Sequence, residues 1–268
     1  MANYIVTVAT ESHTDGLAGL VRSLRRVGWE DEVLVFCPRD EVWDPGLSRV
    51  AVVPLDPWWE TFYPKEQMSR DARFLKPTLP DQFQDDDRIL FFDGGDILVY
   101  GSPEPLFAGV DNLMVVPAQP DRNGRVLPGW VELFGVAKES IPWWTSGIWM
   151  AKVTQETRRF FDLWKALCGW SIAHGEGDMV PFNLAHAVWG VMPGQMETTR
   201  TWHWLPDYGN VVWRGEKPFT QDGKAVSCIH GAGTAHTVYD DAYRRMMGRS
   251  RRTMKLDEHS RWKPVGLP

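Results

Sequence analysis

Cysteine is scarce in this sequence, and long apolar runs are absent. Only three of the 268 residues are cysteines, and they are widely spaced at Cys37, Cys168 and Cys228. Because no C-x-x-C pair is present, a zinc–thiolate site and a disulfide scaffold are both excluded as the organising feature. A sparse, odd set of cysteines is typical of a reducing compartment, so we expect a cytoplasmic protein. No stretch reaches the roughly 18 apolar residues that a membrane span needs, so none is expected.

Several familiar sequence signals are also missing. The N-terminal stretch MANYIVTVATESHTDG has no basic segment followed by a long apolar core, so we expect no signal peptide. The chain contains no GxxxxGK[ST], no GxGxxG after a strand, no GxSxG and no HExxH. The G-x-G-x-R loop of sugar-phosphate nucleotidyltransferases is missing after the first strand. With a formal net charge of -6, the whole chain has no overall attraction for nucleic acid.

Apolar and aromatic residues are plentiful, but charge is unevenly distributed. The sequence is 43% hydrophobic and 12% aromatic, which is enough for one sizeable core. Between Arg244 and Lys263 there are eight basic residues and two acidic ones. This basic end is either a solvated terminal helix or a patch for an anionic partner such as DNA or phospholipid.

Buried strands alternate with amphipathic helices along the chain, which predicts an α/β fold with a mostly parallel sheet between helices. The expected strands are Tyr4–Ala9, Glu32–Cys37, Val50–Leu55, Arg88–Phe92, Leu113–Pro117, Gly147–Ala151 and Ala225–Ile229. The expected helices are Leu17–Val27, Ser69–Leu79, Thr154–Leu167 and Met179–Val188, with a polar loop at Thr10–Gly16. We expect one catalytic domain over residues 1–238 and a basic C-terminal appendage over residues 239–268.

Two carboxylates interrupt an otherwise apolar stretch, FFDGGDILVYGSPEPLF. Asp93 and Asp96 follow the strand Arg88–Phe92, and ligands of open parallel sheets bind at the carboxyl ends of strands. Carboxylate oxygens suit Mn²⁺ or Mg²⁺ carrying a diphosphate. The glycines Gly94 and Gly95 permit positive φ angles and close backbone approach, which would let both aspartates turn toward one ion. The alternative is a tight turn whose aspartates only accept hydrogen bonds from local amides.

This stretch resembles the GT-A glycosyltransferases of family 8, the group of glycogenin and bacterial galactosyl- and glucosyltransferases. In that family an apolar strand ends in D-x-D, followed by an apolar run and a "pLf"-like segment; here DGGD stands in place of D-x-D. The segment from His230 to His236, HGAGTAH, is similar to the family's H-x-x-G-x-x-K, with His236 replacing the lysine. The resemblance implies a metal site made by Asp93, Asp96 and His230, with His236 beside the diphosphate.

Further segments follow the family order between Tyr4 and His236. Arg73–Lys76 (RFLK), Thr145–Gly147 (TSG) and Asp178–Asn183 (DMVPFN) are similar to family segments that contact the donor. The resemblance implies that the nucleotide sugar is held by Ala9, Thr10, Arg73, Lys76, Gly95, Ser146, Gly147, Asn183, Gly233 and His236. It implies catalytic roles for Asp178, Lys76 and Ser146. For Asp178 the alternative is a helix N-cap.

The implied activity is metal-dependent transfer of a hexose from a UDP-sugar, with retention of the anomeric configuration. The metal is Mn²⁺ or Mg²⁺, and no protein nucleophile is assigned. The acceptor stays open between a glycan, a protein, a small molecule and modified DNA, and the sequence says nothing of the oligomeric state. Two other interpretations remain: a non-catalytic protein that binds nucleotide sugars or glycans, and a protein that binds nucleic acid through its basic end.

Overall fold

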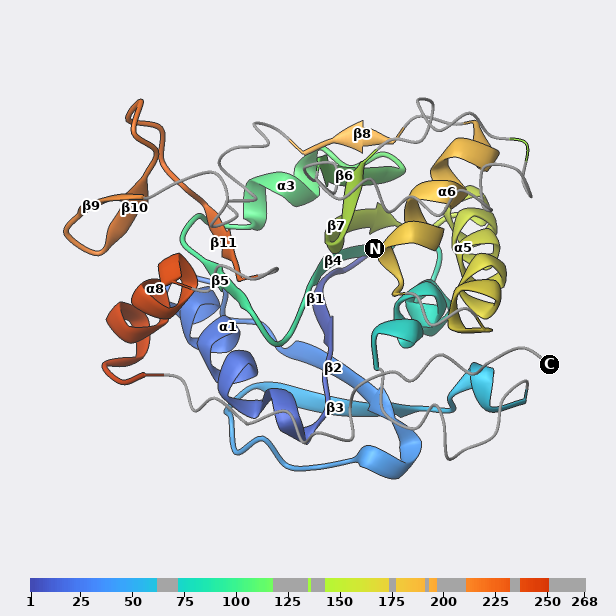
Figure 1. The fold of residues 1–268 in the computed structure, drawn as a ribbon, viewed down its shortest axis with the longest axis horizontal. Coiled ribbons are helices and arrows are strands. Elements are labelled where there is room, and N and C mark those ends of the chain that lie inside the picture. Colours follow the sequence, from blue (N-terminus) through green and yellow to red (C-terminus); the bar gives the residue numbers. More distant parts are fainter. Residues whose placement is uncertain are drawn as a thin grey trace.

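A seven-stranded sheet forms the centre of the computed structural model, which describes residues 1–61, 72–117, 143–173, 177–190, 193–196, 211–231 and 237–250 together with Gly135 (Figure 1). The strand order is β3-β2-β1-β4-β7-β6-β8. The strands are β1 (Asn3–Val8), β2 (Val33–Pro38), β3 (Val50–Leu55), β4 (Arg88–Phe92), β6 (Leu113–Pro117), β7 (Trp144–Lys152) and β8 (Gly194–Gln195). β1 to β4 are parallel, and β7 runs antiparallel to its neighbours β4 and β6. The mostly parallel α/β sheet predicted from the sequence is confirmed.

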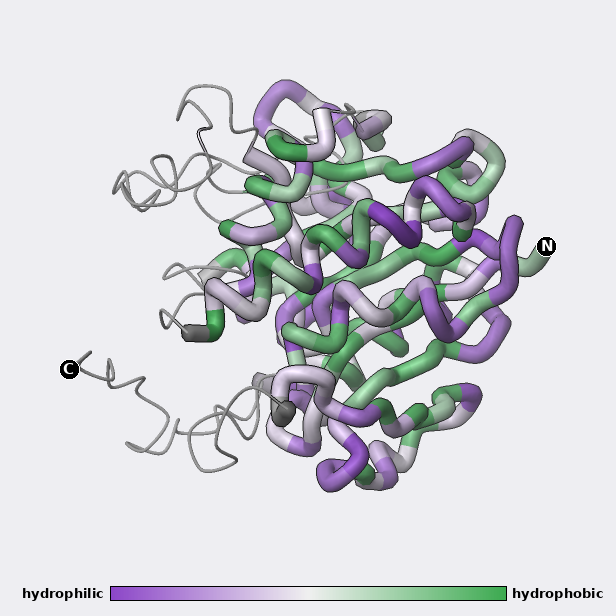
Figure 2. The backbone as a smooth tube through the Cα atoms, turned by 90° about the vertical axis from the view of Figure 1, so that its right-hand side faces the viewer, coloured by the Kyte–Doolittle hydropathy of each residue, from purple (hydrophilic) through white to green (hydrophobic). Residues whose placement is uncertain are grey.

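Helices cover both faces of the sheet, and the side chains of β4 alternate between them. Ile89 and Phe91 pack in the core under α5 (Gln155–Ala173), α6 (Met179–Trp189) and the 3₁₀ helix η4 (Ala72–Gln82). Leu90 and Phe92 pack on the opposite face, with α1 (Thr14–Arg26) and α3 (Glu104–Ala108). Burial on both faces explains why β4 is apolar at successive positions rather than alternating. In Figure 2 the strands run through the middle of the molecule as mostly hydrophobic segments.

A second, two-stranded ribbon lies at one end of the sheet. β5 (Ile97–Val99) pairs antiparallel with β11 (Cys228–His230), and α8 (Thr237–Met247) packs on this ribbon through Tyr239 and Tyr243. The strand predicted at Ala225–Ile229 is found only in part, because β11 begins at Cys228 and ends at His230, and it joins β5 and not the main sheet. The predicted domain boundary at residue 238 lies inside α8 and stays a prediction. The hairpin of β9 (Val212–Arg214) and β10 (Lys217–Phe219) was not predicted.

Two predicted segments, the helix at Ser69–Leu79 and the loop at Thr10–Gly16, have a different secondary structure from the one expected. The described part of the segment predicted as an α-helix at Ser69–Leu79 is the 3₁₀ helix η4, which contains Pro77 and Pro80. Proline has no amide hydrogen and clashes with the preceding turn, so a regular α-helix does not continue through it. The predicted polar loop at Thr10–Gly16 instead contains the 3₁₀ helix η1 (Glu11–His13) and the start of α1. Two short 3₁₀ helices also occur, η2 (Arg39–Glu41) and η3 (Trp58–Thr61).

Ion pairs occupy the described part of the basic end. Arg244 and Arg245 lie 3.9 and 2.9 Å from Asp241, and Arg249 lies 2.8 Å from Asp15 of α1. Residues 251–268 lie outside the described part of the chain, so a role of the basic end in binding an anionic partner stays a prediction. No helix in the described ranges is long and apolar enough to cross a membrane.

Candidate metal and nucleotide-sugar site

The acidic turn, Asp93 to Asp96, follows β4 at the carboxyl edge of the sheet. The amide of Asp93 donates to the carbonyl of Gly147 at 2.9 Å, which extends the β4–β7 ladder by one residue. Neither glycine uses the positive φ angle that it permits, but the close approach expected at these positions is present. Their small size is what the turn needs: a Cβ atom on Gly94 would lie 2.6 Å from Thr7 Oγ1, and one on Gly95 would lie 2.8 Å from His13 Cδ2.

The β5–β11 ribbon brings a distant histidine to this turn. His230 pairs with Ile97 in the antiparallel register, and the amide of Gly231 donates to the carbonyl of Asp96 at 2.7 Å. The imidazole is buried, with 3% of the residue exposed. Backbone pairing of β5 with β11 therefore places His230 beside Asp96 independently of side-chain contacts.

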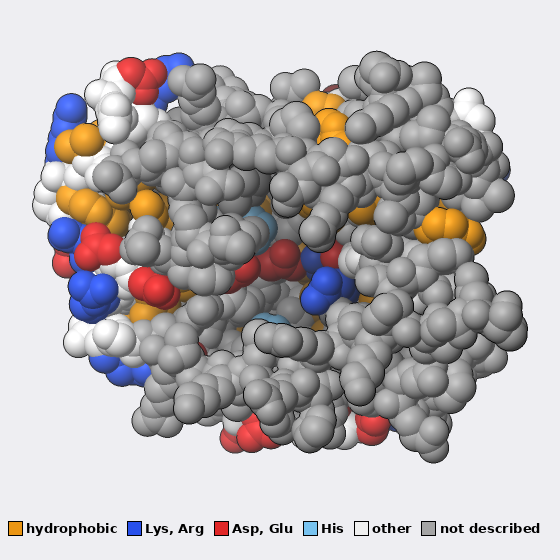
Figure 3. Space-filling model, in the orientation of Figure 1, with side chains coloured by type: hydrophobic (Ala, Val, Ile, Leu, Met, Phe, Trp, Pro, Cys, Tyr) orange, Lys and Arg blue, Asp and Glu red, His pale blue; other side chains and the backbone are white. Residues whose placement is uncertain are grey.

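The side chains of Asp93, Asp96 and His230 face one another. His230 Nε2 lies 3.3 Å from Asp96 Oδ1 and 3.9 Å from Asp93 Oδ2, and one ligand atom from each residue lies within 4.8 Å of the others. Burial works to lower the pKa of His230, but Asp96 and Asp93 raise it above its ordinary value. Two carboxylates and an imidazole gathered in this way fit a divalent cation such as Mn²⁺. Figure 3 shows acidic, basic and histidine side chains together near the middle of this face.

Lys76 of η4 lies beside the acidic turn, buried to 2% exposure. Its Nζ lies 2.8 Å from Asp93 Oδ1, 2.9 Å from Asp178 Oδ2 and 3.4 Å from the carbonyl of Ser146. Burial works to lower the pKa of Lys76, but the two carboxylates outweigh it and raise the pKa. Lys76 therefore carries its proton and lies between Asp93 of this cluster and Asp178.

Asp178 stands at the N-cap position of α6, but its side chain makes no capping hydrogen bond. The carboxylate instead turns toward Lys76 and accepts a hydrogen bond from Ser146, which lies inside β7. Burial works to raise the pKa of Asp178, and Lys76 and Arg73 lower it below its ordinary value. The backbone is held in place by the Trp164 indole, which donates to the Asp178 carbonyl at 3.1 Å. Asp178 is thus an ionised carboxylate aimed into the site.

Two other residues predicted to bind the nucleotide sugar, Ala9 and Asn183, make contacts within the protein core and backbone. Ala9 is buried in a core cluster beside α1, and its amide continues the β1 ladder to Phe36. Asn183 accepts from the Trp144 amide at 2.6 Å and donates to the Trp144 carbonyl at 2.9 Å, so it fastens α6 to the start of β7. Contacts of these residues with a donor stay predictions. Gly233 and His236 lie outside the described residues.

The sequence analysis does not predict His13 as a site residue, yet His13 lies at the acidic turn. Its Nδ1 is 3.0 Å from Thr10 Oγ1 and 3.2 Å from Ser12 Oγ, and its ring lies against Gly95. The residue is exposed at the same edge as Asp96. The available signal was its position: the polar TESH run directly follows a buried strand, where ligands of parallel sheets bind.

Comparison with known proteins identifies the fold. No family model and no curated protein sequence matches the chain. Among solved structures, the galactosyltransferase LgtC in complex with donor and acceptor sugar analogs has a TM-score of 0.61 at 15% identity, covering 97% of this chain and 98% of that one. The chain has a GT-A glycosyltransferase fold.

Two further structures agree with this assignment. An active-site mutant of LgtC has a TM-score of 0.54 at 16% identity, covering 87% of this chain and 88% of that one. The bifunctional glycosyltransferase WbbM has a TM-score of 0.55 at 12% identity, covering 91% of this chain and 49% of that one. At these identities the likeness establishes the GT-A fold, in agreement with the resemblance seen in the sequence.

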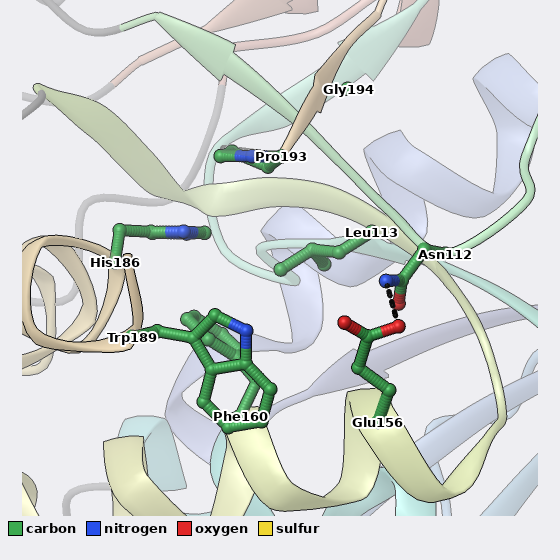
Figure 4. Close-up of a pocket in the computed structure, with 8 residues that line it drawn as sticks. All are labelled: Asn112, Leu113, Glu156, Phe160, His186, Trp189, Pro193 and Gly194. Carbon is green, nitrogen blue, oxygen red and sulfur yellow. Dashed lines mark hydrogen bonds between the residues drawn. The ribbon is translucent and has the colours of Figure 1, made fainter. Parts of the chain in front are cut away.

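A separate small cavity lies at the opposite edge of the sheet, near the start of β6 and the end of α6 (Figure 4). Its volume is about 50 Å³, and Figure 4 shows His186 pointing into it above Trp189 and Phe160. His186 is buried, and its ring centroid lies 4.4 Å from that of Phe160. Its Nε2 has no hydrogen-bond partner within the described part of the chain. Burial lowers the pKa of His186 to about 3.

His186 should make the folded state less stable in acid. Below its unfolded pKa of roughly 6.5 the unfolded chain binds a proton that the folded chain does not, so stability is lost as pH falls from there toward 3. His186→Phe removes this titrating group. Its unfolding free energy relative to wild type, from urea denaturation, should rise by about 2 kcal/mol between pH 7 and pH 5. The control Phe160→Leu carries no proton, so its difference should be independent of pH; a pH-independent difference for His186→Phe would contradict the burial argument.

Proposed function

We propose that this protein is a metal-dependent glycosyltransferase that moves a hexose from a UDP-sugar to an acceptor. The observation that carries the proposal is the assembly of Asp93, Asp96 and His230 at the carboxyl edge of a GT-A sheet. The replacement of D-x-D by DGGD does not separate the two aspartates, since both contribute a ligand atom to the cluster. The fold likeness to LgtC supports the same class of reaction.

The proposed roles follow from position. Asp93, Asp96 and His230 would hold Mn²⁺ or Mg²⁺, and the bound ion would neutralise negative charge on the departing diphosphate. Thr10 and His13 lie at the end of β1 beside Gly95, where the nucleoside portion of the donor would lie. Ser146 and Asp178 face the donor sugar and orient its hydroxyl groups, because both lie beside the acidic turn and within reach of one another.

We further propose that the anomeric configuration is retained without a covalent intermediate on the protein. The bond from the anomeric carbon to the diphosphate oxygen breaks, the bond to the acceptor oxygen forms on the same face, and the acceptor proton goes to the leaving diphosphate. Asp178 is the carboxylate nearest to the proposed sugar position, but its pKa is lowered by Lys76 and Arg73. Its Oδ2 lies 2.9 Å from Lys76 Nζ, so we assign Asp178 to orienting the sugar and give it no role as a nucleophile.

The experiment that tests the function is donor consumption. The purified protein is incubated with a panel of UDP-hexoses, with Mn²⁺ or with EDTA, and UDP release is measured together with the anomeric configuration of the freed or transferred sugar by proton NMR. The expected result is metal-dependent UDP release with the donor's configuration retained in the first product. Binding of UDP-sugars without any turnover would instead favour a non-catalytic nucleotide-sugar-binding protein.

A further inference from the structure

We infer that Lys76 is an internal counter-ion that positions Asp93 and Asp178, and that it does not contact the donor diphosphate. The inference rests on the proposed function for its meaning, but its evidence is the surroundings of one buried ammonium group. It differs from the interpretation suggested by the RFLK segment, in which Lys76 meets the phosphates or the sugar.

Protein oxygens surround the ammonium group of Lys76. A lysine ammonium has three donors and no acceptor. Three oxygens lie within reach of Lys76 Nζ: Asp93 Oδ1 at 2.8 Å, Asp178 Oδ2 at 2.9 Å and the Ser146 carbonyl at 3.4 Å. All three oxygens belong to the protein, so Lys76 Nζ is surrounded by protein oxygens before a phosphate approaches. The contact with Asp178 is an ion pair, since Asp178 Oδ2 accepts no hydrogen bond within the described residues.

Lys76 and its partner Asp178 are both removed from water. The side chain of Lys76 is 3% exposed, and that of Asp178 is 9% exposed. Phe91 of β4 lies beneath the ammonium, with the ring centroid 5.2 Å from Nζ. A charge that is removed from water in this way needs partners in fixed positions, and removing one partner of such a group is strongly destabilising. Asp93 and Asp178 supply those partners without any bound nucleotide sugar.

Contact with Lys76 orients both carboxylates. Asp93 uses Oδ1 for Lys76, and this leaves Oδ2 facing His230 at 3.9 Å. Asp178 is drawn away from a capping role on α6 and into the site. One cation therefore sets the orientation of a metal ligand and of the proposed sugar-binding carboxylate together. Lys76 therefore lies between the proposed metal site and the proposed sugar site and contacts one carboxylate of each.

The test is thermal unfolding without donor or metal. Lys76→Met leaves two carboxylates without their cation, so the melting temperature should fall by about 10 °C. The double variant Lys76→Met/Asp178→Asn carries one fewer unpaired charge and should recover part of that loss. The control Lys152→Met removes a more exposed ion pair with Asp86, 2.7 Å long, and should shift the melting temperature by less than about 2 °C.

A second readout separates an internal counter-ion from a phosphate contact. In the double variant, the rise in melting temperature caused by Mn²⁺ plus UDP should persist to at least half of the wild-type rise. The inference is overturned if Lys76→Met melts within about 2 °C of wild type without donor and loses the response to Mn²⁺ plus UDP. It is also overturned if the double variant is no more stable than Lys76→Met, or if both fail to fold. If wild type shows no response to Mn²⁺ plus UDP, the proposed function fails, while the donor-free arms still decide the role of Lys76.

Discussion

Replacing Asp96 by alanine should lower metal-dependent UDP-sugar turnover at least about 1,000-fold, because the proposed catalysis depends mainly on electrostatic stabilisation of the departing diphosphate. Asp96 supplies the oxygen nearest to His230, at 3.3 Å from its Nε2. Its backbone carbonyl is also tied to Gly231, so the turn keeps its place when the side chain is removed. The loss should therefore appear in metal binding and turnover while the fold persists.

Turnover is measured as UDP release at saturating Mn²⁺, and metal binding is measured by calorimetry without donor. The matched control is Asp162→Ala, which removes an exposed aspartate from α5, far from the acidic turn in the sequence. The control should keep wild-type turnover and Mn²⁺ affinity. An Asp96→Ala protein that folds, binds no Mn²⁺ and still turns over the donor would remove the metal from the mechanism.

Replacing Asp178 by asparagine should lower kcat by about 100-fold or more while leaving Mn²⁺ affinity within roughly threefold of wild type. The change keeps the size of the side chain but removes the charge that faces the proposed sugar position. Lys76 retains Asp93 as a partner at 2.8 Å, so the metal cluster stays assembled. A specific loss in kcat would place Asp178 at the sugar and not among the metal ligands.

Steady-state turnover over a range of donor concentrations separates kcat from KM, and Asp162→Asn is the control for loss of an aspartate charge. The product of Asp178→Asn should keep the wild-type anomeric configuration if no covalent intermediate forms on this residue. Unchanged kcat in Asp178→Asn would contradict the assignment of this carboxylate to the sugar site.

The sequence predicted the sheet and the acidic turn well, and there is a physical reason. β4 is buried on both faces, so an apolar run that stops at Asp93 marks the end of the strand directly. The same pattern predicted β3 to the residue and β1 and β2 to within one residue at each end. His230 was predicted as a metal ligand only through the family resemblance, because pairing of β11 with β5 is a long-range contact that local pattern does not encode.

The rest depended on contacts that a single sequence does not display. Positions 94 and 95 need glycine because Thr7 and His13 approach them closely. This requirement is visible only in the folded structure. Pro77 indicated the end of a regular helix, but it did not reveal that η4 would bury Lys76 between two aspartates. For Asp178 the sequence left helix capping and catalysis open, and the side-chain direction in the structure disfavours capping.

The most direct test of the central claim is a crystal soaked with Mn²⁺ and UDP and measured at the manganese absorption edge. We expect one anomalous peak bonded to Asp93, Asp96 and His230, with the diphosphate of UDP on the open side of the ion. A peak elsewhere, or UDP bound at this edge of the sheet with no metal at these three residues, would contradict the account.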